Sequence, residues 1–97
     1  MKKMVKTSFD HAKNRRTLYV PDEFVEDLGW PDEAWLQAEI GRRGEVVIRQ
    51  STDMVRARFK RYPSYNRLTL PLTTEEEYTR DVRIETHPGG ILLVKFL

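Results

Sequence analysis

The sequence predicts a mainly β domain with two short helices, built from two copies of a β-β-α-β-β unit. Three observations support this: predicted strands that alternate apolar and charged side chains, an internal repeat, and turn-forming residues between the strands. The 97 residues are 39% hydrophobic and 33% charged, as expected for one globular domain over residues 1–97. The chain has no cysteine and no apolar run near the roughly 18 residues of a membrane helix, so we expect a cytoplasmic protein.

The first half of the chain resembles the second half when the sequence is shifted against itself. A shift of 50 residues aligns the early part and a shift of 46 aligns the later part, because the second copy is shorter after its helix. The aligned pairs share residue type: Val5 with Val55, Phe9 with Phe59, Leu18 with Leu68, Glu39 with Glu85 and Gly44 with Gly90. We therefore predict a first repeat at residues 1–50, a linker at 51–54 and a second repeat at 55–97.

The first repeat contains four predicted strands and one predicted helix. Its elements are the strands 4–9 and 16–21, the helix 22–29 and the strands 35–40 and 46–50. The polar loop 10–15 joins the first pair of strands, and the Gly-containing turn 41–45 joins the second pair. Acids in the first helical turn are typical of a helix N-terminus, and Gly29 is a natural helix stop.

The second repeat follows the same order. Its elements are the strands 55–62 and 67–72, the helix 73–79 and the strands 82–86 and 91–97. In the first of these strands Val55, Ala57 and Phe59 point to one face, and the cations between them point to the other, which predicts a half-buried strand with a cationic outer face. Pro71 ends the second strand because proline cannot donate to a strand ladder.

Charge is segregated along the chain although the net charge is only +2. Residues 1–16 carry six Lys or Arg and one acid, and residues 17–41 carry seven acids and no Lys or Arg. Residues 42–67 carry eight cations and two acids. Such blocks predict separate positive and negative surfaces, each of which can select a partner.

Each repeat has a strand, a loop, a strand that begins with Arg and ends with Pro, a short helix and a final hairpin. This order resembles the AbrB/SpoVT-type swapped-hairpin domain, whose relatives include the MazE-type antitoxins and MraZ. The residues that carry the resemblance are "RRTLYVPDEFVEDLGW" and "AEIGRRGEVVIR" in the first repeat, and "NRLTLPL" and "IETHPGGILLVK" in the second. In that family two ββαββ units interleave into one β-barrel. The resemblance therefore implies a single-chain pseudo-dimer of the tandem, MraZ-like kind, with further oligomerisation left open.

The resemblance also places the first hairpin of each repeat on a nucleic-acid-binding side. The basic residues predicted there are Lys6, Lys13, Arg15, Arg16, Arg56, Arg58, Lys60, Arg61 and Arg67. Clustered cations bind DNA phosphates in a salt-dependent way, and Tyr62 and Tyr65 can contact phosphates or stack on exposed bases. We therefore expect a protein that binds double-stranded DNA and regulates transcription. The alternatives are a solvated cationic strand face without a ligand and a contact surface for an acidic protein partner.

A second hypothesis uses the acidic residues. In this interpretation the protein is a protein-binding modulator, either antitoxin-like or a phage or host factor that binds RNA polymerase. Its predicted contact residues are Trp30, Trp35, Glu26 and Asp27, because Trp is common at binding hot spots and acids dock on basic grooves. The alternative for the acidic residues is helix capping and solubility, and the alternative for the two tryptophans is a place in the core beside the short helix.

No residue pattern predicts an enzyme. His11 and His87 lack the companions and spacing of metal ligands, so we expect no metal and no cofactor. Gly89 and Gly90 are too few for a phosphate-binding loop. No pair of carboxylates stands at a position that suggests catalysis.

Overall fold

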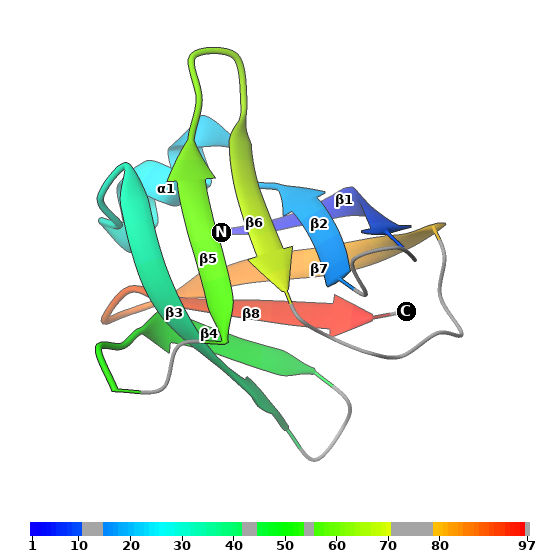
Figure 1. Ribbon diagram of the computed structural model, residues 1–97. Coiled ribbons are helices and arrows are strands. Elements are labelled where there is room, and N and C mark those ends of the chain that lie inside the picture. Colours follow the sequence, from blue (N-terminus) through cyan, green and yellow to red (C-terminus); the bar gives the residue numbers. More distant parts are fainter. Residues whose placement is uncertain (11–14, 42–44, 54–55, 71–78, 97) are drawn as a thin grey trace.

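A closed barrel of eight antiparallel strands forms the molecule in the computed structural model, which describes residues 1–10, 15–41, 45–53, 56–70 and 79–96 (Figure 1). Around the barrel the strands follow the order β1-β2-β6-β5-β3-β4-β8-β7, and β7 pairs with β1 to close it. The elements are β1 (Lys2–Asp10), β2 (Arg15–Tyr19), α1 (Asp22–Leu28), β3 (Glu33–Ile40), β4 (Val46–Gln50), β5 (Ala57–Arg61), β6 (Asn66–Leu70), β7 (Thr79–His87) and β8 (Ile91–Phe96).

The predicted mainly β fold and the first predicted helix are confirmed. The second predicted helix, at 73–79, lies outside the described residues except for its last residue. That residue, Thr79, begins strand β7 instead. None of the helices in the described ranges is long and apolar enough to cross a membrane. The barrel takes four strands from residues 2–50 and four from residues 57–96, so both halves of the chain contribute to one core.

Strand alternation fills the inside of the barrel. Leu18, Leu68 and Ile84 are completely buried and lie on three different strands. On β5 Ala57 and Phe59 are buried, whereas the cations beside them face outward, as the alternation in the sequence predicts. Val55, the third apolar residue of that predicted pattern, lies outside the described residues. The outward side chains of the barrel are therefore the ones available for binding.

Helix α1 is tied to β6 at its beginning and ends at a glycine. Asn66 donates from Nδ2 to the Val20 carbonyl at 2.9 Å and to the Asp22 carboxylate at 2.7 Å, which fixes the chain where the helix starts. The helix buries Phe24, Val25 and Leu28 in the same core cluster as the strands. Gly29 follows with φ of 70°, and its N–H donates to the Val25 carbonyl. The predicted helix stop is confirmed.

Replacing Gly29 with Ala should lower the free energy of unfolding by about 1 kcal/mol, because a non-glycine residue is strained in the left-handed region. A Cβ at this position would meet no heavy atom within 4 Å, so the loss is conformational and not steric. Urea unfolding measures it. Gly29→Asn is the matched control and should lose less, because Asn tolerates this backbone conformation. Equal stability of the Ala variant and the wild type would contradict this reading.

Candidate nucleic-acid interface

Four adjacent strands carry a continuous set of outward-facing cations, which we call the basic face. One row of cross-strand partners runs Ser8↔Thr17, Thr17↔Thr69 and Thr69↔Arg58, so β1, β2, β6 and β5 form one uninterrupted surface. The basic face is defined by Lys6, Arg15, Arg56, Arg58, Lys60 and Arg67. Lys6, Arg56 and Arg58 are exposed, and the other three are half-buried. Six of the nine cations predicted from the sequence are thus brought together.

Arg16 does not belong to this surface, and the prediction that it faces DNA is corrected. It has 0% exposure, because strand alternation turns it inward two residues before the buried Leu18. Its Nη1 donates to Thr7 Oγ1 at 2.7 Å, and its guanidinium carbon lies 5.4 Å from the centre of the Phe96 ring. The inward orientation of Arg16 was predictable from the sequence, by counting the strand alternation back from Leu18.

Of the two remaining predicted cations, Arg61 also stands apart from the basic face. Arg61 is exposed, but it lies at the end of β5 and forms an ion pair of 3.6 Å with Asp22 at the start of α1. Lys13 lies outside the described residues. Among the described residues, the interface therefore rests on six of the predicted cations.

Neighbouring side chains hold two cations of the basic face in place. Lys60 forms an ion pair of 3.3 Å with Glu33 across the β3–β5 pair and lies 5.2 Å from the centre of the Tyr62 ring. Arg67 donates from Nη2 to the Tyr62 hydroxyl at 2.8 Å, and its guanidinium carbon lies 5.1 Å from the same ring. Because Tyr62 orders both cations, less side-chain entropy is lost when they bind an anion.

Exposed aromatic rings lie among the cations. Trp35 on β3 is 54% exposed, and the guanidinium carbon of Arg58 lies 4.5 Å from the centre of its ring, a cation–π contact. Tyr19 on β2 is 55% exposed, and Tyr65 in the β5–β6 turn is 42% exposed. Tyr19 was not among the site residues predicted from the sequence, although it shares its strand face with Arg15 and Thr17. Cations interleaved with exposed aromatics are typical of nucleic-acid surfaces.

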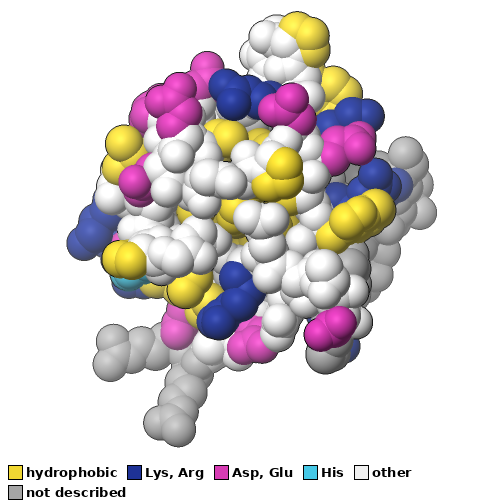
Figure 2. Space-filling view, turned by 90° about the vertical axis from the view of Figure 1, so that its left-hand side faces the viewer, with side chains coloured by type: hydrophobic (Ala, Val, Ile, Leu, Met, Phe, Trp, Pro, Cys, Tyr) yellow, Lys and Arg dark blue, Asp and Glu magenta, His cyan; other side chains and the backbone are white. Residues whose placement is uncertain are grey.

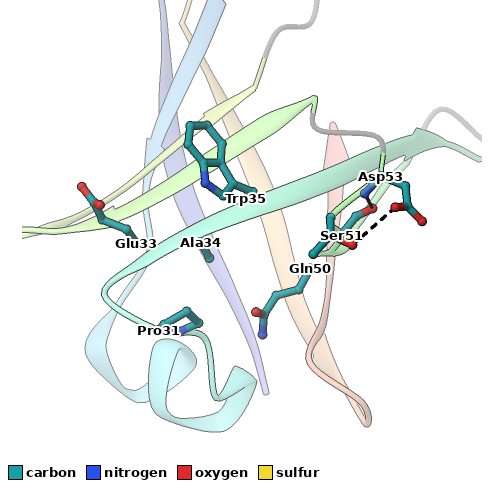
Figure 3. Close-up of a pocket in the computed structure, with 8 residues that line it drawn as sticks. Pro31, Glu33, Ala34, Trp35, Gln50, Ser51 and Asp53 are labelled. Carbon is teal, nitrogen blue, oxygen red and sulfur yellow. Dashed lines mark hydrogen bonds between the residues drawn. The ribbon is translucent and has the colours of Figure 1, made fainter.

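An open groove of about 490 Å³ lies beside Trp35, between the start of β3 and the segment after β4. Its lining includes Pro31, Glu33, Trp35, Ser51 and Asp53. Ser51 donates its backbone N–H to the Trp35 carbonyl at 3.1 Å, and the Asp53 N–H donates to Ser51 Oγ at 3.2 Å, which orders this segment (Figure 3). Figure 3 shows Trp35 and α1 on opposite sides of the β3 ribbon.

The predicted protein-binding residues do not form one surface. Trp30 is buried, its Nε1 donates to the Gly90 carbonyl at 3.0 Å, and its ring packs edge-on against Phe59 at 5.4 Å. The prediction that Trp30 anchors a partner is therefore corrected: it is a core residue. Glu26 and Asp27 are exposed on α1, and Asp27 accepts a hydrogen bond from Thr86. On the side of the molecule shown in Figure 2, acidic and basic side chains are interspersed.

A second charge cluster surrounds Glu85 on the outer side of β7. Its carboxylate lies 3.3 Å from Arg83, 3.4 Å from Lys95 and 4.0 Å from Lys2, and it forms a hydrogen bond of 3.3 Å with His87. Burial by itself raises the pKa of Glu85, but the hydrogen bond with His87 and the charges of Lys95 and Lys2 outweigh it, so the pKa lies below its ordinary value.

Glu85 should therefore stabilise the fold at neutral pH and lose that effect in acid. A carboxylate whose pKa is lowered by folding stabilises the native state above its unfolded-state pKa, and the contribution disappears as the pH falls through the lowered pKa. Glu85→Gln should lower the melting temperature at neutral pH, and the difference from the wild type should shrink on acidification. Thermal melts across that pH range test this. Glu26→Gln, at an exposed helical position, is the control. A difference independent of pH would contradict the assignment.

The chain matches no protein-family model, no curated protein and no solved structure. Within the described residues no group of three or more His, Cys, Asp or Glu could hold a metal ion. The functional conclusion therefore rests on the charge and geometry of the barrel surface.

Proposed function

We propose that this protein binds DNA through the basic face and acts as a transcriptional regulator. The observation that carries the proposal is the gathering of six cations on adjacent strands, three of which, β2, β5 and β6, contain no acidic residue. Duplex DNA presents about one negative charge per 1.7 Å of axis, so a sheet surface with this many cations gains affinity by releasing counterions.

In this mechanism the exposed cations provide affinity, and the ordered cations fix the orientation of the protein on the DNA. Lys6 on β1, Arg58 on β5 and Arg56 just before β5 reach phosphates from the two edges of the basic face. Arg67, held by Tyr62, lies between them on β6 and is oriented before DNA binds. Phosphate contacts fix the orientation of the protein on the duplex, and side chains at the edge of the face then read groove shape or individual bases.

We also infer that the barrel consists of two interleaved ββαββ repeats, as in a swapped-hairpin domain. The strand order is unchanged when β1–β4 are exchanged with β5–β8, which supports this inference. The exchange centres on the pairs Leu18↔Leu68 and Val47↔Leu93. Along the described strands, the two hairpins of one half do not pair with each other. Each hairpin is flanked by strands of the other half, so neither half has a closed sheet of its own.

The strand registers also support a small change in the repeat alignment. Thr7 pairs with Leu18 on β1–β2, and Phe59 pairs with Leu68 on β5–β6. Leu18 and Leu68 differ by 50 residues, whereas Thr7 and Phe59 differ by 52. The first strands of the proposed repeats therefore align with a shift of 52 and not 50, and the first connecting loop is longer in the first repeat.

Nuclear magnetic resonance titration with a short random duplex tests the DNA-binding proposal. Backbone amide shifts should change on β1, β2, β5 and β6, and much less on β4 and β8, which lie across the barrel from β2 and β6. Shift changes confined to β4 and β8, or an unchanged spectrum at low salt, would overturn the proposal.

A protein-binding function is the second candidate, because Trp35 is more than half exposed at the edge of a groove. Large exposed aromatics beside a pocket are typical of binding hot spots. Under this alternative the partner is a protein such as RNA polymerase or a toxin. Trp35→Ala should then abolish binding of that partner, while DNA affinity stays absent even at low salt.

A further inference from the structure

A small open pocket of about 340 Å³ lies at one end of the basic face, beside two of its exposed tyrosines. Its lining includes Lys3, Tyr19, Pro21, Asp22, Ser64 and Tyr65. The Tyr19 and Tyr65 rings meet edge to face, with centres 5.4 Å apart and an angle of 80° between their planes. The pocket therefore has two aromatic walls set nearly at right angles.

The aromatic walls are held by the rest of the β5–β6 turn. Tyr62 stacks on Tyr65 with ring centres 4.7 Å apart, and the Tyr62 N–H donates to the Tyr65 carbonyl at 2.8 Å. The Tyr62 hydroxyl accepts from Arg67, which belongs to the basic face. Tyr19 pairs directly with Arg67 across β2 and β6. The pocket and the proposed phosphate-binding cations are thus adjacent parts of one surface.

The pocket also carries a fixed hydrogen-bond acceptor. The Asp22 side chain is 72% exposed, but Asn66 donates to it at 2.7 Å and Arg61 pairs with it at 3.6 Å. An exposed carboxylate held in this way can accept hydrogen bonds from the amino group of a nucleobase. A flat ring that stacks on a tyrosine and offers N–H donors at its edge suits these walls.

We propose that this pocket takes one unpaired nucleobase, which single-stranded or locally opened DNA can offer. The inference rests on the proposed function, since the phosphates of the same strand would lie on the basic face. Bases stack on aromatic side chains largely regardless of sequence, and a paired base inside a duplex has no free face to offer.

Fluorescence anisotropy with two labelled single strands of about 12 nucleotides tests the proposal. One strand is intact, and the other has the same backbone and charge but abasic sites in place of its bases. The wild type should bind the intact strand at least about tenfold more tightly, because stacking is lost without bases. Tyr19→Ala should weaken binding of the intact strand about tenfold and leave the abasic strand unchanged. Tyr19→Phe keeps the ring and should stay near wild type.

The outcomes separate this inference from the function on which it rests. Equal affinity for the intact and abasic strands would overturn the base pocket and leave the phosphate-binding face standing. Equal weakening of both strands by Tyr19→Ala would overturn it too. If the intact strand, the abasic strand and duplex DNA all fail to bind at low salt, the proposed function is overturned, and the pocket with it. Because Tyr19 is more than half exposed, its variants should fold normally, and circular dichroism checks this.

Discussion

Arg56→Gln combined with Arg58→Gln should weaken duplex binding between about 10- and 100-fold at low salt. Arg58 is exposed on the outer side of β5 and Arg56 is exposed just before that strand, so their removal deletes phosphate contacts without opening the core. The same double variant should reduce the magnitude of the slope of log K against log salt by about two, because each phosphate contact contributes roughly 0.9 to that slope. Anisotropy titrations at several salt concentrations measure both quantities.

The matched control removes the same charge from the other side of the barrel. Arg49→Gln combined with Lys95→Gln takes two cations from β4 and β8, which lie opposite β2 and β6 in the strand order. This variant should bind duplex DNA within about threefold of wild type, since distant charges are screened beyond about one Debye length. Equal loss in the two double variants would mean that net charge, and not the basic face, determines binding.

Phe59→Ala should lower the free energy of unfolding by about 3–5 kcal/mol. Phe59 is almost fully buried, pairs with Leu68 on the neighbouring strand and packs against Trp30. Truncation therefore removes apolar contacts and leaves a cavity between β5 and the segment that follows α1. Phe59→Leu keeps most of the volume and should cost less than about 1.5 kcal/mol. Urea unfolding monitored by circular dichroism gives both values.

The same experiment tests the proposed interleaving of the two repeats. Since β1 pairs with β7 and β3 pairs with β5, neither half can leave the barrel without breaking pairs of the other half. Unfolding of the wild type and of Phe59→Ala should therefore remain one cooperative transition with the same m-value. Two separate transitions, one for each half of the chain, would contradict interleaving.

Most of the strand pattern could be predicted from the sequence because it depends on local alternation. The apolar side chains of Ala57 and Phe59 alternate with cations, and this alone indicated which face of β5 is buried. The helix stop at Gly29 was predictable for the same reason, since a left-handed residue is a local requirement. Both features follow from neighbours within a few residues.

The candidate site was only partly predictable, because it depends on pairing between distant strands. The inward side of Arg16 follows from local alternation, but its hydrogen bond with Thr7 depends on how β1 and β2 pair. Trp30 and Trp35 look alike in sequence, yet one donates to the Gly90 carbonyl in the interior and the other packs under Arg58. Contacts of this kind are decided by the tertiary register, which composition and spacing do not contain.

The salt dependence of duplex binding by the wild-type protein tests the central proposal most directly. With six cations on the basic face, log K should fall with log salt with a slope of about −5, and binding should be readily measurable at about 50 mM salt. This result would show a phosphate-binding surface of the proposed size. No binding at about 50 mM salt, where nonspecific attraction is strong, would contradict DNA binding and favour a protein partner at the Trp35 groove.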